Sequence, residues 1–194
     1  MLDNKKDWID QAKKNFRNHK AKFKQFDGIS TLDWRNIDGS SNYYVRYVFD
    51  EDKGCLYITG DLGSAVVRLT EKATSESLSS YINSVYYFLG KILCSTDKYV
   101  YDVELARNEL EQHLISPDAE YEDERLEELR ELVADTLECF DTFKGFDLSE
   151  DVEERLSKED ADYWEWIYTI GKDVDTRIIL WLVGLQMAHN QICK

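Results

Sequence analysis

The chain is poor in the residues that interrupt regular structure and in those that bind metals. Its 194 residues include one proline, nine glycines and three histidines. So few prolines and glycines predict long regular elements with few breaks. The histidines His19, His113 and His189 are scattered, so neither a zinc site nor a Ser/His/Asp triad has support. The sequence therefore predicts no metal site, and each histidine is expected to be a partly buried helical residue.

Cysteine pairs and long hydrophobic runs are also missing. The four cysteines are widely separated and form no CxxC motif, which predicts free, mostly buried thiols in a reducing cytoplasm. No hydrophobic stretch follows Met1, and the longest apolar run, residues 178–185, is too short to cross a bilayer. We therefore expect a cytoplasmic protein with no membrane partner.

Signatures of catalysis are absent as well. No window fits a calcium-binding EF-hand loop, and the many acidic residues give no reason to select one catalytic pair. The one glycine-rich turn, residues 59–64, joins two predicted strands, whereas a phosphate-binding loop leads from a strand into a helix. The sequence predicts a non-enzymatic protein without a cofactor or catalytic residues, and an enzyme with an unfamiliar site is the lesser alternative.

What the chain does contain is negative charge, unevenly distributed. Its formal net charge is -15, and residues 97–165 hold 25 Asp and Glu against 7 Lys and Arg. Residues 1–26 have the opposite balance, with eight Lys and Arg against three Asp. Charge of one sign on a folded chain opposes compaction and attracts a surface of the other sign. The acidic segment therefore predicts a basic partner.

Hydrophobic periodicity predicts a single α+β domain over residues 1–194. Residues 1–26 are expected to form a basic amphipathic helix, because Trp8, Ala12, Phe16, His19 and Phe23 recur every three or four positions. Alternation with a period of two follows over residues 28–70. It predicts a four-stranded antiparallel meander with strands at 29–36, 42–50, 55–59 and 64–69.

Residues 74–193 are predicted to be helical and acidic. Helices are expected from Thr74 or Ser75, over 102–114, from Pro117 behind a Ser116 cap, after Ser149, and over 161–171 and 174–192. The last two segments are the most apolar, so we expect them to form the central packing against the sheet.

Twelve acids are the candidate partner-binding residues. Carboxylates three or four positions apart on a helix lie about 5–6 Å from each other, close to the spacing of phosphates along a nucleic-acid strand. Arg125 and Arg130 are the only cations between 118 and 138. The alternative is a solvated face, since glutamate is a good helix former. The set comprises Asp118, Glu120, Glu122, Asp123, Glu124, Glu127, Glu128, Glu131, Glu150, Asp151, Glu153 and Glu154.

Other features have two interpretations each. The basic first helix either clamps the protein's own acidic half or contacts nucleic acid or another subunit. Arg35, Arg46 and Arg68, with Trp34 and Tyr44, either form a base-stacking surface or bridge the sheet to acidic helices. The aromatic residues at 164, 166, 168 and 181 are either interface anchors or core residues.

Two stretches resemble a known family. Residues 34–66 contain WRNIDGSSNYYVRYVFDEDKG and GDLGSAV, and residues 163–188 contain YWEWIY and WLVGLQMA. They resemble small acidic proteins carried by phages and mobile elements of low-GC Gram-positive bacteria. The resemblance covers most of the chain, but its motifs mark the fold, so no functional residue is carried across.

The resemblance, together with the charge, implies a host-defence inhibitor of the anti-CRISPR kind in the bacterial cytoplasm. Its partner would be a basic nucleic-acid-binding protein, a Cas9-type effector nuclease above all, and direct binding of nucleic acid is not expected. The alternative is an oligomeric accessory or DNA-binding protein that uses the basic first helix and the strand arginines. The sequence leaves open whether the protein forms a homodimer.

Overall fold

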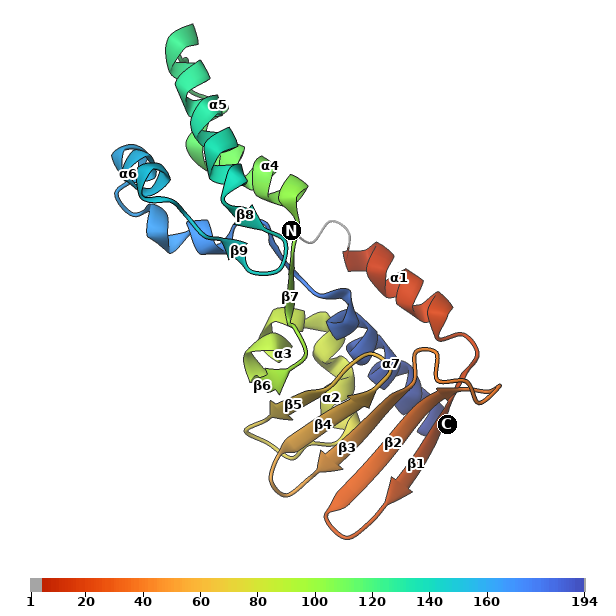
Figure 1. Ribbon diagram of the computed structural model, residues 1–194. Helices are drawn as coiled ribbons and strands as arrows, with labels where there is room; N and C mark the ends of the chain where they lie inside the picture. The colour runs from red at the N-terminus through yellow and green to blue at the C-terminus, as the bar shows by residue number, and fades with distance from the viewer. Residues whose placement is uncertain (1–4, 194) are drawn as a thin grey trace. The chain divides into compact units, whose positions relative to one another are not determined.

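The computed structural model of the chain describes residues 5–193, which divide into two compact units (Figure 1). Unit 1 contains the residues up to Lys98 and those from Asp175 onward. Unit 2 contains Tyr99–Val174. Helices and antiparallel strands are both present, which confirms the α+β class. That the chain forms a single domain stays a prediction.

Unit 1 is built on a six-stranded antiparallel sheet in which every strand pairs with the next one along the chain. The four predicted strands are present, and two further strands, β1 and β6, extend the sheet at its two edges. The strands are β1 His19–Gln25, β2 Ile29–Asn36, β3 Val45–Asp50, β4 Cys55–Gly60, β5 Ala65–Arg68 and β6 Ile92–Ser95.

The predicted basic helix over residues 1–26 is wrong in its second half. Helix α1 covers Lys5–Asn15, the chain turns, and strand β1 begins at His19; the first four residues of the prediction lie outside the described part. Residues 16, 19 and 23 fit a helical period, but β1 pairs with β2 along its whole length, so hydrogen bonding to the neighbouring strand decided the conformation. His19 is therefore a buried strand residue. His189 is helical and partly buried as predicted, whereas His113 is helical but exposed.

Helix α7, Thr176–Ile192, provides the central packing of unit 1. It contacts α1, β1, β2 and β3, and it also contacts α2, Ser75–Ser79. Trp34, Tyr47 and Phe49 on the sheet and Trp181 on the helix are completely buried. The prediction that the C-terminal helix packs against the sheet is confirmed.

The helix predicted from residue 74 is broken into short pieces. Thr74 caps α2 as expected, accepting a hydrogen bond from Ser77 N at 3.0 Å. A 3-10 turn, η1 Ser80–Asn83, follows, then α3 Val85–Lys91 and the edge strand β6. Serines at 79, 80 and 84 and Asn83 are weak helix formers, which lets the chain turn and pair with β5.

Unit 2 contains three helices around a small core. The helices are α4 Val103–Leu114, α5 Asp123–Glu138 and α6 Glu150–Glu159; Asp102 caps α4 and Ser149 caps α6. Strand β7 Tyr99–Tyr101 pairs with β10 Lys172–Val174, and β8 Phe140–Asp141 pairs with β9 Gly145–Phe146. The helix predicted over 161–171 is wrong: two 3-10 turns, η2 Tyr163–Glu165 and η3 Ile167–Thr169, occupy that segment.

Candidate partner-binding surface

The two units carry charge of opposite sign. Unit 2 holds 25 Asp and Glu against 7 Lys and Arg, a formal charge of -18, so the remainder of the chain carries +3. The excess acid of the sequence is thus confined to one compact unit. A charge of this size within 76 residues creates a strong local negative potential.

The side chains of α5 divide into an apolar face and an acidic one. Leu129, Leu132, Val133 and Thr136 are buried against the core of unit 2. The acids of α5 in the candidate set, Asp123, Glu124, Glu127, Glu128 and Glu131, are all exposed. The helical period therefore places them outside the core face, as expected from the sequence.

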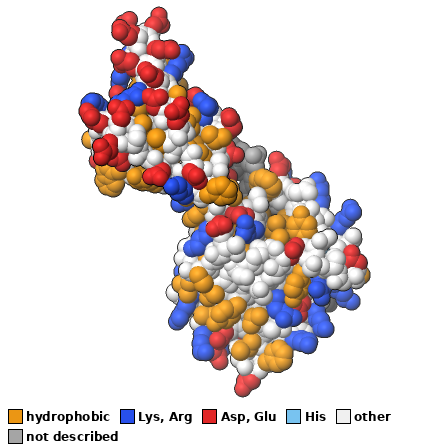
Figure 2. Space-filling model, in the orientation of Figure 1, with side chains coloured by type: hydrophobic (Ala, Val, Ile, Leu, Met, Phe, Trp, Pro, Cys, Tyr) orange, Lys and Arg blue, Asp and Glu red, His pale blue; other side chains and the backbone are white. Residues whose placement is uncertain are grey.

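The acids of α6 extend this surface. Val152 and Leu156 are buried, while Glu150, Asp151 and Glu154 are exposed and Glu153 is half-buried. Helix α6 packs against α5. Figure 2 shows Asp and Glu side chains gathered over these two helices. We name the twelve predicted acids the acidic surface.

The acidic surface does not lie on continuous helix. Asp118, Glu120 and Glu122 are exposed but precede α5, which begins at Asp123 and not at Pro117 as predicted. Ser116 does not cap a helix: its carbonyl accepts from Ala119 N at 3.3 Å and its N–H donates to the Tyr121 hydroxyl at 3.1 Å. These two bonds close a turn, so helical spacing applies only from Asp123 onward.

Two arginines connect α5 to α6. Arg125 binds Glu128 of its own helix at 3.0 Å and Glu159 of α6. Arg155 of α6 binds Asp135 of α5. The hydrogen bonds that Arg125 donates to Glu128 and Glu159 raise the pKa of its guanidinium. The bridges hold the two acidic helices side by side with the cations between them.

Most of the acidic surface is not neutralised. Glu128 pairs with Arg125, Asp151 lies 4.0 Å from Arg155, and Glu154 pairs with Lys158 at 2.8 Å. The hydrogen bond from Lys158 lowers the pKa of Glu154. The other nine acids make no ion pair within residues 5–193: Asp118, Glu120, Glu122, Asp123, Glu124, Glu127, Glu131, Glu150 and Glu153.

Exposed aromatic residues accompany the acids in unit 2. Phe143 is 90% exposed at the tip of the β8–β9 hairpin, and Trp164 is 58% exposed. Trp166 stacks on His113 at 4.4 Å, with its Nε1–H donating to Asp160 at 2.8 Å. The sequence analysis did not single out Phe143. The sequence feature that indicates an exposed side chain here is a phenylalanine within a turn that begins at Asp141. The Asp141 carboxylate accepts a hydrogen bond from Phe143 N at 2.7 Å.

Unit 1 has a basic surface of its own, on the sheet face opposite α7. Cross-strand register places Lys20 opposite Arg35 and Lys22 opposite Asp33, and Asp33 is in turn opposite Arg46 on β3. Lys24 of β1 and Arg68 of β5 lie on the same face. We name these six exposed cations, Lys20, Lys22, Lys24, Arg35, Arg46 and Arg68, the basic sheet face.

Aromatic rings are part of the basic sheet face, but Trp34 is not one of them. The Arg35 guanidinium lies 4.8 Å from the centre of the Tyr44 ring, and Tyr57 is exposed on β4. Trp34 is buried on the other face, because neighbouring strand residues point in opposite directions. Asp33 accepts from Arg46 Nε at 2.7 Å and from the Tyr44 hydroxyl at 2.6 Å.

Within residues 5–193 no group of three or more His, Cys, Asp or Glu side chains is arranged to hold a metal ion. None of the helices described is long and apolar enough to span a membrane. Comparisons with protein-family models, with curated proteins and with solved structures found no match.

Proposed function

We propose that this protein is a non-enzymatic inhibitor of a nucleic-acid-binding host-defence complex, an anti-CRISPR protein that acts on a Cas9-type effector. Such effectors hold the guide and target strands in a positively charged channel and read a short DNA motif with arginines. The acidic surface is the part that would enter this channel or cleft. The observation that carries the proposal is the formal charge of -18 in unit 2. Most of the acidic side chains responsible for it are exposed and make no ion pair among the described residues.

Geometry supports mimicry of a nucleic-acid backbone. Glu124, Glu127 and Glu131 follow each other at intervals of three and four residues on α5, which places their Cβ atoms about 5–6 Å apart and their carboxylates along one face of the helix. The arginine bridges to α6 keep this row and the acids of α6 on a fixed support. A fixed array loses little conformational entropy on binding.

The exposed aromatics supply what charge alone does not. Charges at the rim of an interface mainly raise the association rate and select partners, whereas buried aromatic anchors slow dissociation. Phe143 and Trp164 are in unit 2 together with the acidic surface. We propose that one or both insert into the partner.

A charge-reversal experiment tests the proposal. Asp118, Glu120, Glu124 and Glu127 are replaced by lysine; Glu131 is kept because its charge supports Arg155. We expect binding to a purified Cas9-type effector loaded with guide RNA to weaken about 100-fold or more. The matched control replaces four exposed acids of unit 1, Asp7, Asp27, Glu71 and Glu76, and should bind like the unaltered protein.

Salt dependence gives a second readout on the unaltered protein. Raising the salt concentration from about 0.05 M to about 0.3 M should reduce the affinity about tenfold or more, because screening shortens the range of the field. Circular dichroism establishes that the reversed variants are folded. Full inhibition by the folded variant reversed in unit 2, or a complex insensitive to salt, would contradict mimicry by the acidic surface.

The basic sheet face favours a second candidate function, direct binding of single-stranded nucleic acid as a DNA-binding accessory protein. Six exposed cations share this face with Tyr44 and Tyr57. Cations that follow a phosphate backbone, combined with rings on which bases stack, are the usual means of binding single strands. In this candidate the strand lysines take the role that the sequence analysis gave to a longer basic helix.

A gel-shift assay separates the two functions. Under the second candidate the purified protein binds single-stranded DNA. A variant with Lys20, Lys22 and Lys24 replaced by glutamine should then lose affinity for this DNA by about tenfold or more. A control variant replaces Lys13, Lys53 and Lys72, exposed lysines outside the basic sheet face. No shift with the unaltered protein would contradict the second candidate, and it is the result expected of a mimic.

A further inference from the structure

A polar pocket of about 410 Å³ lies in unit 1, where α1 ends and β1 begins. Four asparagines, Asn15, Asn18, Asn36 and Asn42, contribute to its wall together with His19. Its volume is within the range of small-molecule sites, about 300–1,000 Å³. The pocket shares no residue with the acidic surface or the basic sheet face.

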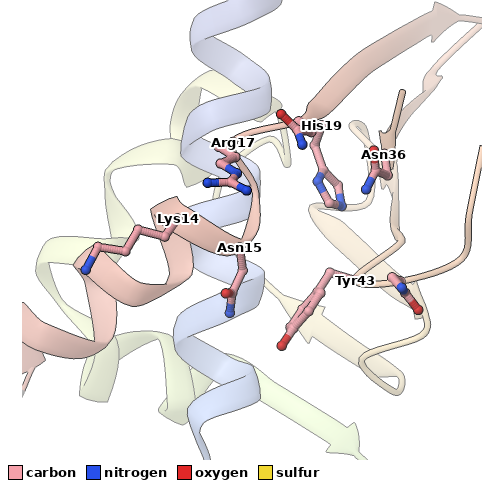
Figure 3. Close-up of a pocket in the computed structure, with 8 residues that line it drawn as sticks. Lys14, Asn15, Arg17, His19, Asn36 and Tyr43 are labelled. Carbon is pink, nitrogen blue, oxygen red and sulfur yellow. The ribbon is translucent and has the colours of Figure 1, made fainter. Parts of the chain in front are cut away.

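His19 is the feature that suggests a ligand. The side chain is only 4% exposed, and within the described residues neither ring nitrogen makes a hydrogen bond of normal geometry; the backbone carbonyls of Asn42 and Tyr43 lie near the ring and interact with it only weakly. The ring is held between Phe16, with centres 5.0 Å apart, and Trp34, with centres 5.5 Å apart. Figure 3 shows it directed toward Tyr43, with Asn36 beside it. Buried polar groups without partners are rare in folded proteins and require an explanation.

Burial lowers the pKa of His19, although the backbone carbonyls of Asn42 and Tyr43 and the charge of Asp38 act in the opposite direction. The imidazole is therefore neutral at pH 7, with one nitrogen able to donate and the other able to accept. A ligand that reaches both nitrogens would complete the hydrogen bonding of the ring.

The charged residues of the wall favour an anion. Lys14 and Arg17 line the pocket and no carboxylate does, although the chain contains 39 Asp and Glu. Two acids of adjoining loops are bound to the backbone: Asp38 accepts from Ser40 N at 2.7 Å, and Asp61 accepts from Tyr43 N at 2.9 Å.

The loop that carries Tyr43 is fixed in an uncommon conformation. Tyr43 has φ of 56°, in the left-handed region that residues other than glycine rarely adopt. The bond from its N–H to Asp61 holds it there. Its ring is partly exposed at the pocket and lies 6.1 Å from the Phe16 ring, centre to centre. A flat ring system of a ligand could stack on such a surface.

We propose that the His19 pocket binds a small phosphorylated molecule of about the size of a nucleoside monophosphate. Arg17 and the donating nitrogen of His19 bind the phosphate. The asparagine side-chain amides, each with two N–H donors and a carbonyl acceptor, bind the polar groups of the rest of the ligand. Figure 3 shows the Lys14 side chain extending away from His19, so Arg17 is the cation that the proposal tests.

The experiment follows the ring nitrogens of His19 by NMR while adenosine monophosphate, adenosine or inorganic phosphate is added to the full-length protein. We expect adenosine monophosphate to shift the His19 signals saturably and to leave those of His113 and His189 unchanged. A bound phosphate should also raise the pKa of His19, because a nearby anion favours the charged imidazole. Adenosine and inorganic phosphate should each bind at least about tenfold more weakly than adenosine monophosphate.

Variants assign the contacts by calorimetry. Arg17→Gln should weaken the binding of adenosine monophosphate about tenfold, the loss expected for a hydrogen bond to a charged group. Lys24→Gln, an exposed lysine of β1 outside the pocket, is the matched control and should bind normally. His19→Phe keeps a ring between Phe16 and Trp34 and should abolish binding. If this variant does not fold, the affinity of Arg17→Gln for adenosine monophosphate is the test of the proposal.

Three results would overturn the proposal. The first is no shift of His19 with any of the three compounds at millimolar concentration. The second is adenosine binding as tightly as its monophosphate, which would remove the role of the phosphate. The third is inorganic phosphate binding as tightly as adenosine monophosphate, which would remove the role of the rest of the molecule. Calorimetry in which Arg17→Gln binds like the unaltered protein would likewise contradict the proposed phosphate contact.

Discussion

At the scale of single residues, Gly184 lies where α7 packs closely against the sheet. Tyr47 of β3 is completely buried, and its hydroxyl donates to the Trp181 carbonyl of α7 at 2.7 Å. A Cβ atom on Gly184 would lie 2.9 Å from that hydroxyl and 3.2 Å from Cδ1 of Trp34. Glycine in the middle of this helix is thus a packing requirement, although it lowers helix propensity.

Gly184→Ala should lower the free energy of unfolding by about 1 kcal/mol. Alanine favours the helix by about 1 kcal/mol, but overpacking of a buried core costs about 1–3 kcal/mol, and the Tyr47 and Trp34 rings that the methyl group would meet are completely buried. Urea unfolding followed by fluorescence measures the change.

Gly90→Ala is the matched control for that substitution. Gly90 is exposed on α3, and an added Cβ atom would meet no atom within 4 Å. It should therefore raise the free energy of unfolding by about 0.5–1 kcal/mol, because alanine has the better helix propensity. If Gly184→Ala stabilised the protein as much as Gly90→Ala, this would contradict the argument that a Cβ atom at position 184 is too close to the sheet.

At the scale of elements, α5 carries acids at both of its ends. Asp123 and Glu124 in the first turn interact favourably with the positive end of the helix dipole. Glu138 is the last residue of the helix, no basic residue occupies the last turn, and a carboxylate there meets the negative end. The same type of side chain should therefore stabilise one end and destabilise the other.

Two substitutions with the same charge change should act in opposite directions. Glu138→Lys should raise the free energy of unfolding by about 0.3–1 kcal/mol, and Asp123→Lys should lower it by a similar amount. Thermal unfolding at low ionic strength measures both. Neither residue makes an ion pair within the described residues. At about 1 M salt the difference should largely disappear; equal effects of both substitutions would contradict the dipole argument.

At the scale of the whole molecule, the segregation of charge should make the two units respond differently to salt. Like charges repel each other within unit 2, which carries -18, whereas the rest of the chain carries +3. Screening removes repulsion and therefore stabilises unit 2 preferentially.

Hydrogen exchange resolved by residue measures this difference. Raising the salt concentration from about 0.02 M to about 0.5 M should slow the exchange of the amides of α5 and α6 more than that of the amides of β3 and α7. Sodium chloride is the suitable salt, because sulfate strengthens hydrophobic burial everywhere. Equal slowing in the two units would mean that the acids of unit 2 do not repel one another appreciably.

Much of the architecture could be predicted because its signals are local. Alternation of apolar and polar residues indicated strands β2 to β5, and a capping residue at Thr74 or Ser75 indicated the start of α2. The acidic run indicated an exposed surface, since leucines at helical spacing leave the acids outside the core. The period of two also implies that Trp34 and Arg35 point to opposite faces, an implication that the sequence analysis did not draw.

By itself the sequence determined the α+β class, the apolar C-terminal helix, and the amount and location of the negative charge, because each depends on composition or on short-range periodicity. Tertiary structure decided that residues 19–25 and 92–95 are edge strands, that the chain turns before α5, and that His19 is buried beside a polar pocket. Each of these depends on which groups of the folded chain hydrogen-bond or pack together, and the periodicity of a single segment carries no information about such partners.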